Sequence, residues 1–286
     1  MDYLATKYLK TKKIPSTACS GCGLGQVHKK VLLAIDELGL DTGDIVWGTG
    51  IGCSGRQTFN TWKGDNFAGT HGRVYAIATG LRLALPPEKK IVLTVGDGDA
   101  FGIGLLHLLH SVRRNVDMTV VVADNFGYQS TGGQYGYTTP NGSVTDSSPY
   151  GMQDPNWVQD GRDILDILRA AGAGFLARHT SVEGQNAVES IKKAIQFKGF
   201  SLVHVAYPCI TNFAGKALGS RKPVVAYRWL KERTNPEPAK AIEGITFRTG
   251  IYHQATASRP EFSEQMRNFT AAVRKEGQNE TNGNIG

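Results

Sequence analysis

The sequence predicts an α/β protein with a doubly wound, mostly parallel sheet. Short apolar segments rich in β-branched residues alternate with longer segments whose apolar residues recur every three or four positions, up to about residue 208. The short segments are apolar throughout rather than at every second position. That pattern is typical of strands buried on both faces, so helices should cover both sides of the sheet.

The predicted helices and strands follow one another in a regular order. Helices are expected over residues 25–39, 74–85, 103–114, 163–172 and 183–196. Strands are expected over residues 44–48, 91–95, 117–125, 175–180 and 200–207. A glycine stops the first helix and two consecutive prolines end the second, so local residues alone set these two boundaries.

Three segments lie outside this alternation. Residues 126–161 are rich in Gly, Ser, Thr, Tyr and Pro, and so long a loop inside a domain usually carries function. Residues 216–275 are expected to form a C-terminal extension that contacts other subunits, and the polar residues 276–286 a flexible tail. Residues 1–215 then form the domain that carries the candidate sites.

Composition and charge exclude several classes of protein. The chain has 286 residues, of which 40% are apolar, as expected for a globular core. No segment approaches the roughly 20 apolar residues of a membrane helix, and the first residues lack the apolar block of a signal peptide, so a cytoplasmic location is expected. The net charge of +7 is spread along the chain, and Lys and Arg are densest over residues 216–240. This basic region favours a solvated face or an acidic protein partner over nucleic acid.

Four cysteines form the first candidate site. Cys19 and Cys22 lie close together in CSGC, whereas Cys53 and Cys209 each follow a predicted strand and should lie at the carboxyl edge of the sheet, where ligands bind. A disulfide framework is not expected in a cytoplasmic protein. The spacing favours an iron–sulfur cluster; a structural zinc ion, a redox dithiol or inert thiols are the alternatives.

A glycine-rich turn after the strand 91–95 forms the second candidate site. Such turns bind phosphate through backbone amides, but this one reads GDGD, and its Asp97 would repel an anion unless a cation lay between them. Mg²⁺ prefers oxygen ligands, and Asn125 and the carbonyl of Gly127, after the next strand, could supply two more. The sequence therefore predicts a magnesium site through which a diphosphate binds.

Together with the loop that follows it, this turn resembles the thiamine diphosphate-binding motif, in GDGDAFGIG and DNFGYQSTGGQYGYTTP. Over residues 15–215 the chain resembles the β subunit of the 2-oxoacid:ferredoxin oxidoreductases, because CSGCG, GIGCSGR, THGR and YPCIT occur in the same order. Two positions depart from the pattern. Asp124 stands where the general motif often has Asn, and Gly132 stands where some broad-range members have Lys, which bears on substrate range.

The resemblance implies thiamine diphosphate, Mg²⁺ and one four-iron four-sulfur cluster as cofactors, on a sheet of the thiamine diphosphate-binding type. It implies that the cluster is bound by Cys19, Cys22, Cys53 and Cys209, and the magnesium ion by Asp97, Asn125 and Gly127. The implied contacts to thiamine diphosphate are Ile51, Gly52, Cys53, Ser54, His71, Gly96, Gly98, Asp99, Gln129 and Ser130. His71 and Ser130 are the candidate catalytic residues, whereas His107 and His110 are expected to pack or cap a helix.

The resemblance also implies coenzyme A-dependent oxidative decarboxylation of a 2-oxo acid with single electrons passed to ferredoxin, or the reverse reductive carboxylation. 2-Oxoglutarate is the expected substrate, and pyruvate or a broad range of 2-oxo acids is the alternative. The chain has room for one diphosphate-binding module, so an α subunit, alone or fused to a γ subunit, should supply the Glu that activates the cofactor. A zinc protein that binds nucleic acid and an iron–sulfur carrier without catalysis are the alternatives from other classes.

Overall fold

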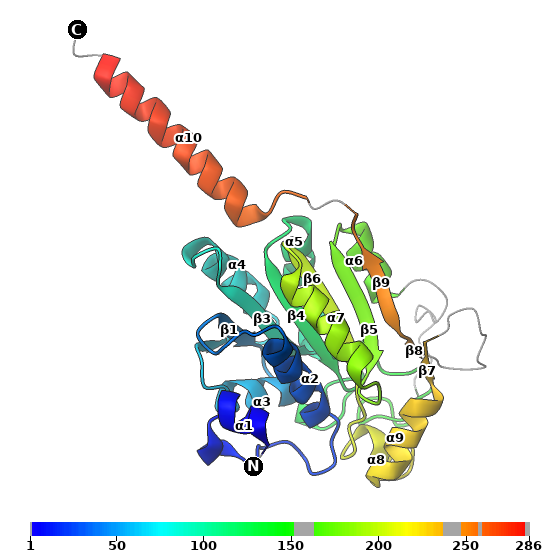
Figure 1. Ribbon diagram of the computed structural model, residues 1–286. Coiled ribbons are helices and arrows are strands. Elements are labelled where there is room, and N and C mark those ends of the chain that lie inside the picture. The colour runs from blue at the N-terminus through cyan, green and yellow to red at the C-terminus, as the bar shows by residue number, and fades with distance from the viewer. Residues whose placement is uncertain (1, 152–162, 237–246, 257–258, 284–286) are drawn as a thin grey trace.

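The computed structural model describes residues 2–151, 163–236, 247–256 and 259–283. Its centre is a seven-stranded sheet in the order β2-β1-β3-β4-β6-β5-β9 (Figure 1). The strands of this sheet are β1 (Ile45–Thr49), β2 (Asn66–Ala68), β3 (Lys90–Gly96), β4 (Met118–Asp124), β5 (Phe175–Thr180), β6 (Phe200–Ala206) and β9 (Gly250–Gln254). All neighbouring pairs are parallel except β5 with β9, so the predicted mostly parallel sheet is confirmed.

Helices cover both faces of the sheet, as predicted (Figure 1). One face carries α1 (Tyr3–Tyr8), α2 (Leu24–Glu37) and α7 (Gln185–Gln196). The other face carries α4 (Val74–Ala84), α5 (Leu105–Arg113) and α6 (Ile164–Ala170). Because each face is covered, successive residues of one strand are buried on opposite sides: Val92 of β3 packs under α2, and Leu93 belongs to the other core.

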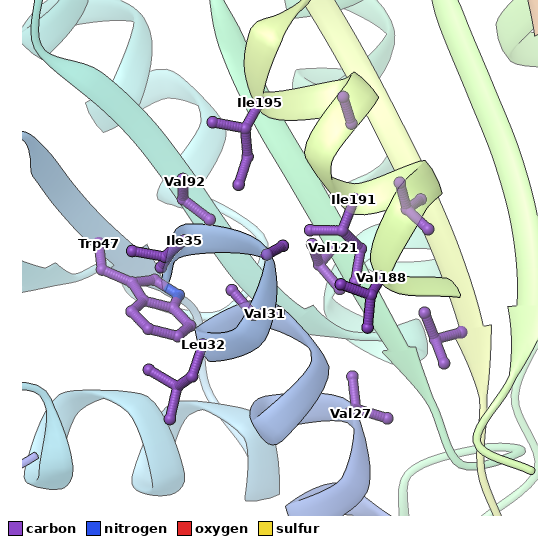
Figure 2. Close-up of a cluster of buried hydrophobic side chains, with 14 of the residues drawn as sticks. Val27, Val31, Leu32, Ile35, Trp47, Val92, Val121, Val188, Ile191 and Ile195 are labelled. Atoms are coloured by element: carbon purple, nitrogen blue, oxygen red, sulfur yellow. The ribbon is translucent and has the colours of Figure 1, made fainter. Parts of the chain in front are cut away.

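The larger core lies between the sheet and the helices α2 and α7. Figure 2 shows Val27, Val31, Leu32 and Ile35 of α2 beside Val188, Ile191 and Ile195 of α7, over Trp47, Val92 and Val121 of the strands. The α2 residues recur at helical spacing, so all four point to the sheet. Burying each such aliphatic side chain is worth about 1.5–3 kcal/mol, and this core holds the strand ends in place.

All ten helices and strands predicted within the alternating region are confirmed, with boundaries shifted by a few residues. The sequence did not predict α1, the strand β2, or α3 (Cys53–Thr61), the helix that begins at one of the cysteines. Between β3 and α5 the chain forms a turn of π-helix over Gly98–Gly102, and a short 3-10 helix over Gln129–Thr131 lies in the long loop after β4. Of that loop, residues 152–162 lie outside the described part.

The C-terminal extension was predicted without secondary structure. The helix α8 (Phe213–Ala217) crosses its expected start at residue 216, and α9 (Pro223–Glu232), β7 (Thr234–Asn235), β8 (Phe247–Arg248), β9 and α10 (Phe262–Gly283) follow. The buried carboxylate of Glu261 accepts hydrogen bonds from the amides of Ser263 and Glu264, 2.9 Å each, which starts α10. The helix continues to Gly283, past residue 276 where the flexible tail was expected to begin; the flexibility of that tail and the contacts of the extension with other subunits stay predictions.

Within the described residues, every helix is too short or too polar to cross a membrane.

Candidate active site

A cavity of about 490 Å³ lies at the carboxyl ends of β1, β3 and β4. The structure brings together around it all the residues predicted to contact the cofactor or the magnesium ion. These residues are Ile51, Gly52, Cys53, Ser54, His71, Gly96, Asp97, Gly98, Asp99, Asn125, Gly127, Gln129 and Ser130. They come from the turns after four adjacent parallel strands, β2, β1, β3 and β4, which is where ligands bind in doubly wound sheets.

The turn between β1 and α3 offers a place for an anion. Gly52 precedes α3 with φ of 126°, a backbone conformation that glycine adopts without strain. The helix begins at Cys53, so the positive end of its dipole borders the cavity. Ser54 also lines the cavity, and its buried hydroxyl has no partner among the described residues. Backbone amides and this hydroxyl together are a suitable donor set for a phosphate group.

Asp97 is buried beneath the cavity, with an exposed fraction of 2%. Its Oδ2 accepts hydrogen bonds from the Gly127 amide at 2.7 Å and the Thr138 hydroxyl at 2.8 Å, and its Oδ1 accepts from the Asn125 amide at 3.3 Å. Burial, and then the charge of Asp124, raise the pKa of Asp97 above its usual range. A buried carboxylate of this kind is a favourable ligand for a cation, which would offset the cost of its charge.

Three oxygens converge at Asp97. In one orientation of its side-chain amide, Asn125 donates from Nδ2 to the Tyr207 hydroxyl at 2.8 Å. The Asn125 oxygen then lies 3.1 Å from Asp97 Oδ1 and 3.0 Å from the carbonyl oxygen of Gly127; in the opposite orientation the amide nitrogen donates to both. Adjacent oxygens around an octahedral Mg²⁺ with bonds of about 2.1 Å stand about 3.0 Å apart, so the first orientation fits the predicted site.

Asp99 has different partners from Asp97. Its Oδ1 accepts hydrogen bonds from the Gly72 amide at 2.8 Å, the Ile51 amide at 3.4 Å and Nδ1 of His71. A methyl group on Gly50 would lie 1.8 Å from Asp99 Oδ2, so a glycine is required beside the carboxylate. Asp99 therefore joins the loop after β1 to the loop that carries His71. Its direct contact with the cofactor stays a prediction.

The two candidate catalytic residues have different neighbours. His71 is held through Nδ1 by Asp99 and meets the ring of Tyr128 edge-on at a centroid distance of 6.2 Å, and its side chain is 34% exposed. Ser130 and Cys53 line the same two cavities, and the Ser130 side chain partly offsets the burial that raises the pKa of the Cys53 thiol. Neither His107 nor His110 of α5 lines the cavity, and their role in packing or capping this helix stays a prediction.

A second cavity, of about 230 Å³, is lined by all four cysteines. It shares six lining residues with the first cavity: Cys53, Arg56, Asn125, Gln129, Ser130 and Tyr207. Burial raises the pKa of the Cys22 thiol to about 12, so without a positive partner this thiol stays neutral. In the described part of the chain, no group of three or more His, Cys, Asp or Glu residues is close enough to hold a single metal ion, around which thiolate sulfurs stand about 3.8 Å apart.

Several polar residues of the site were missed. Thr138 lies in the aperiodic loop, and Tyr207 follows β6 and lines both cavities. Arg178 and His204 lie in the buried strands β5 and β6 and are linked to Asp124 by hydrogen bonds. A signal was present for the last two, since each is a polar residue within an otherwise apolar strand. A polar residue in an apolar strand does not reveal which residue it hydrogen-bonds to, because these contacts join segments far apart in the sequence.

Comparisons with known proteins agree with this geometry. Residues 50–205 match the family model of the thiamine pyrophosphate enzyme, C-terminal TPP binding domain. The chain is 36% identical to the 2-oxoglutarate synthase subunit KorB of Methanocaldococcus jannaschii, over 95% of this chain and 99% of that subunit. The KorB subunit of Archaeoglobus fulgidus is also 36% identical, over 96% and 97% of the two chains.

One solved structure is similar to this chain over most of the length of both. It is the 2-oxoglutarate:ferredoxin oxidoreductase from Magnetococcus marinus with 2-oxoglutarate, coenzyme A and succinyl-CoA bound. Its TM-score is 0.79 at 26% identity, and the likeness covers 94% of this chain and 90% of that one. The β subunit of 2-oxoacid:ferredoxin oxidoreductase 2 from Aeropyrum pernix is 35% identical over 75% of this chain and 64% of that subunit.

Proposed function

This chain belongs to the β subunits of the thiamine diphosphate-dependent 2-oxoacid:ferredoxin oxidoreductases, and from that membership we propose that its substrate is 2-oxoglutarate. The reaction is the coenzyme A-dependent oxidative decarboxylation of the 2-oxo acid, or its reversal, with ferredoxin as electron partner. Support for 2-oxoglutarate comes from the names of the KorB relatives and from the ligands of the similar structure. A broader range of 2-oxo acids is the second candidate, favoured by the Aeropyrum relative. Family membership leaves no support for the alternative of a zinc protein that binds nucleic acid.

The three oxygens that converge at Asp97 are the observation that best supports a magnesium-bound cofactor. The ion would be held by Asp97 Oδ1, Asn125 Oδ1 and the carbonyl oxygen of Gly127. Asn125 Oδ1 lies 3.1 Å from the first of these oxygens and 3.0 Å from the last, which is the distance between adjacent ligands of an octahedral Mg²⁺. The diphosphate would bind through this ion, the first amides of α3 and the hydroxyl of Ser54. When bound, thiamine diphosphate supplies the carbanion chemistry that decarboxylation of a 2-oxo acid requires.

His71 is proposed to handle a proton at the cavity. Asp99 is bonded to Nδ1 of the ring, so the proton of neutral His71 lies on Nδ1 and its Nε2 is left as an acceptor. The same contact fixes the orientation of the ring. His71 can therefore accept a proton at Nε2 or return it without moving, which is the property expected of a general base or acid.

The four cysteines are proposed to bind a four-iron four-sulfur cluster. Four cysteines lining one small cavity are a suitable ligand set for such a cluster, and its iron atoms would favour the thiolate form against the burial that raises the pKa of Cys22. Cys53 and Ser130 line both cavities, so electrons leaving the cofactor cavity would have a short path to the cluster.

The activating Glu is proposed to come from a partner α subunit. Among the described residues that line the cofactor cavity, the acids are Asp97 and Asp99. Both carboxylates already have partners: Asp97 is the predicted metal ligand, and Asp99 accepts hydrogen bonds from His71 and from amides of the two loops that it joins. We therefore propose that the carboxylate for the aminopyrimidine ring is a residue of the α subunit.

Anaerobic co-purification with the partner subunit tests the proposal. The complex is expected to contain thiamine diphosphate and about four iron atoms per β subunit, and to reduce a viologen dye with 2-oxoglutarate and coenzyme A. A panel of 2-oxo acids separates the two substrate candidates. Asp97→Asn should abolish cofactor retention, whereas Asp117→Asn, at the opposite end of β4, should not. If no 2-oxo acid supports dye reduction, the proposed function is wrong.

A further inference from the structure

A chain of hydrogen bonds leads from Asp97 into the body of the sheet. The Thr138 hydroxyl lies 2.8 Å from Asp97 Oδ2 and 2.8 Å from Asp124 Oδ1. The other oxygen of Asp124 lies 2.7 Å from Nε2 of His204 on the neighbouring strand β6. Nδ1 of His204 in turn accepts a hydrogen bond of 3.0 Å from Nε of Arg178 on β5. Asp124 and His204 are almost fully buried, at 1% and 3% exposure.

Arg178 determines which nitrogen of His204 carries the proton. Its guanidinium is held in place by a two-pronged ion pair with Asp163, so its Nε–H points at Nδ1 of His204. A nitrogen that accepts a hydrogen bond cannot also bear a proton. His204 is therefore neutral with its proton on Nε2, and this proton is donated to Asp124 Oδ2.

We propose that Arg178, His204 and Asp124 are positioning residues for the metal site, and that they act by fixing the Nε2–H tautomer of His204. In that tautomer both oxygens of Asp124 must be acceptors: Oδ2 from His204, and Oδ1 from the Phe126 amide at 2.8 Å. The Thr138 hydroxyl lies 2.8 Å from this Oδ1 and 2.8 Å from Asp97 Oδ2, and it donates its single proton to one of the two carboxylates. Thr138 is thereby held between Asp124 and Asp97, which leaves Asp97 Oδ1 directed to the oxygens of Asn125 and Gly127.

The proposal accounts for a departure from the general motif, in which Asn often occupies the position of Asp124. An Asn side chain carries one acceptor and one donor group. Placed here, its nitrogen would face either the Nε2–H of His204 or the amide of Phe126, so two donors would meet in both orientations. Only a carboxylate satisfies every neighbour, provided that Arg178 keeps its hydrogen bond to His204.

The inference rests on the proposed magnesium site and is tested by metal binding rather than by turnover. Mn²⁺ replaces Mg²⁺, and its affinity is measured by electron paramagnetic resonance on the full-length complex with thiamine diphosphate present. Asp124→Asn should weaken Mn²⁺ binding about tenfold or more, since two buried donors are opposed. Arg178→Met should stay within about threefold of wild type, because His204 can keep its Nε2 proton without help.

The double variant Asp124→Asn with Arg178→Met decides the matter. Without Arg178, His204 can move its proton to Nδ1 and accept a hydrogen bond at Nε2 from the amide of the substituted side chain. Mn²⁺ affinity should then return to within about threefold of Arg178→Met alone. Asp117 directly precedes the same strand and lies outside the hydrogen-bonded chain, so the matched control Asp117→Asn should bind Mn²⁺ as wild type does.

The proposal is overturned if Asp124→Asn and the double variant lose Mn²⁺ affinity to the same extent. It is also overturned if Asp124→Asn binds Mn²⁺ as tightly as wild type. A second measurement does not depend on any variant: nitrogen chemical shifts of ¹⁵N-histidine-labelled wild type should show His204 protonated at Nε2 alone. A signal from Nδ1–H at His204 refutes the tautomer argument. If wild type binds neither Mn²⁺ nor thiamine diphosphate, the proposed function fails instead.

Discussion

Replacing Asp99 tests whether this carboxylate joins two loops at the cofactor cavity. In Asp99→Ala, the buried amide of Gly72 and the Nδ1–H of His71 lose their acceptor, together with the weaker bond from the Ile51 amide. Hydrogen bonds to a charged group contribute about 1.5–3 kcal/mol each, so two strong bonds give about 3–6 kcal/mol. Some of this is recovered because a buried charge with one unpaired oxygen is removed, and we expect a net loss of about 3–5 kcal/mol in the free energy of unfolding.

Asp99→Asn is the matched variant, because it keeps an acceptor of the same shape. Its bonds become neutral, and we expect a loss of about 1–2 kcal/mol. Urea unfolding of wild type, both variants and the surface control Asp65→Ala measures these differences, and the control should change stability by less than about 0.5 kcal/mol. Thiamine diphosphate affinity should fall in the same order as stability. If Asp99→Ala costs less than about 1 kcal/mol, or no more than Asp99→Asn, the two loops do not depend on this carboxylate.

Three further predictions concern other parts of the site and its core. His28 is buried against Trp47 with its Nε2 unpartnered, and burial lowers its pKa from 6.5 to about 4. The unfolded chain therefore binds a proton at acid pH that the folded chain does not, so wild type should lose about 2 kcal/mol of unfolding free energy between pH 7 and pH 5 through this residue. Urea unfolding of His28→Phe should not show this loss. Tyr207→Phe should weaken Mn²⁺ binding about 3- to 10-fold in a titration with thiamine diphosphate, since the Asn125 amide loses its hydroxyl partner; unchanged affinity would contradict the role of that hydroxyl. Cys209→Ser should lose most of its iron by metal analysis and keep its thiamine diphosphate; full iron content would exclude this thiol as a ligand.

The alternating strands and helices were predictable because each carries its signal locally. The residues of β4, MTVVVAD, are all buried, so a continuous apolar segment was enough to identify the strand. By contrast, α3 reads CSGRQTFNT and buries Gln57 and Thr58 rather than an apolar stripe. A helix packed through polar and small residues gives no periodic signal.

The edge of the sheet was not predictable for a different reason. The strand β9 lies about seventy residues after its partner β5 and is only partly buried. Its pairing is set by tertiary contacts that no local pattern carries. The same limit applies to the chain from Asp97 to Arg178, whose members lie on separate segments, although the chemistry of each residue was visible in the sequence.

The two aspartates of the GDGD turn differ because β3 lies between β1 and β4 in the sheet. Asp97 accepts amides from the segment after β4, at Asn125 and Gly127, whereas Asp99 accepts amides from the β1 side, at Ile51 and Gly72. In a phosphate-binding loop such amides point at the anion. Here carboxylates accept hydrogen bonds from them and tie the ends of four strands together, so we propose that a diphosphate binds through a cation rather than to those amides. On that proposal, the acids that seem to oppose a phosphate site are the reason that the site takes a metal ion.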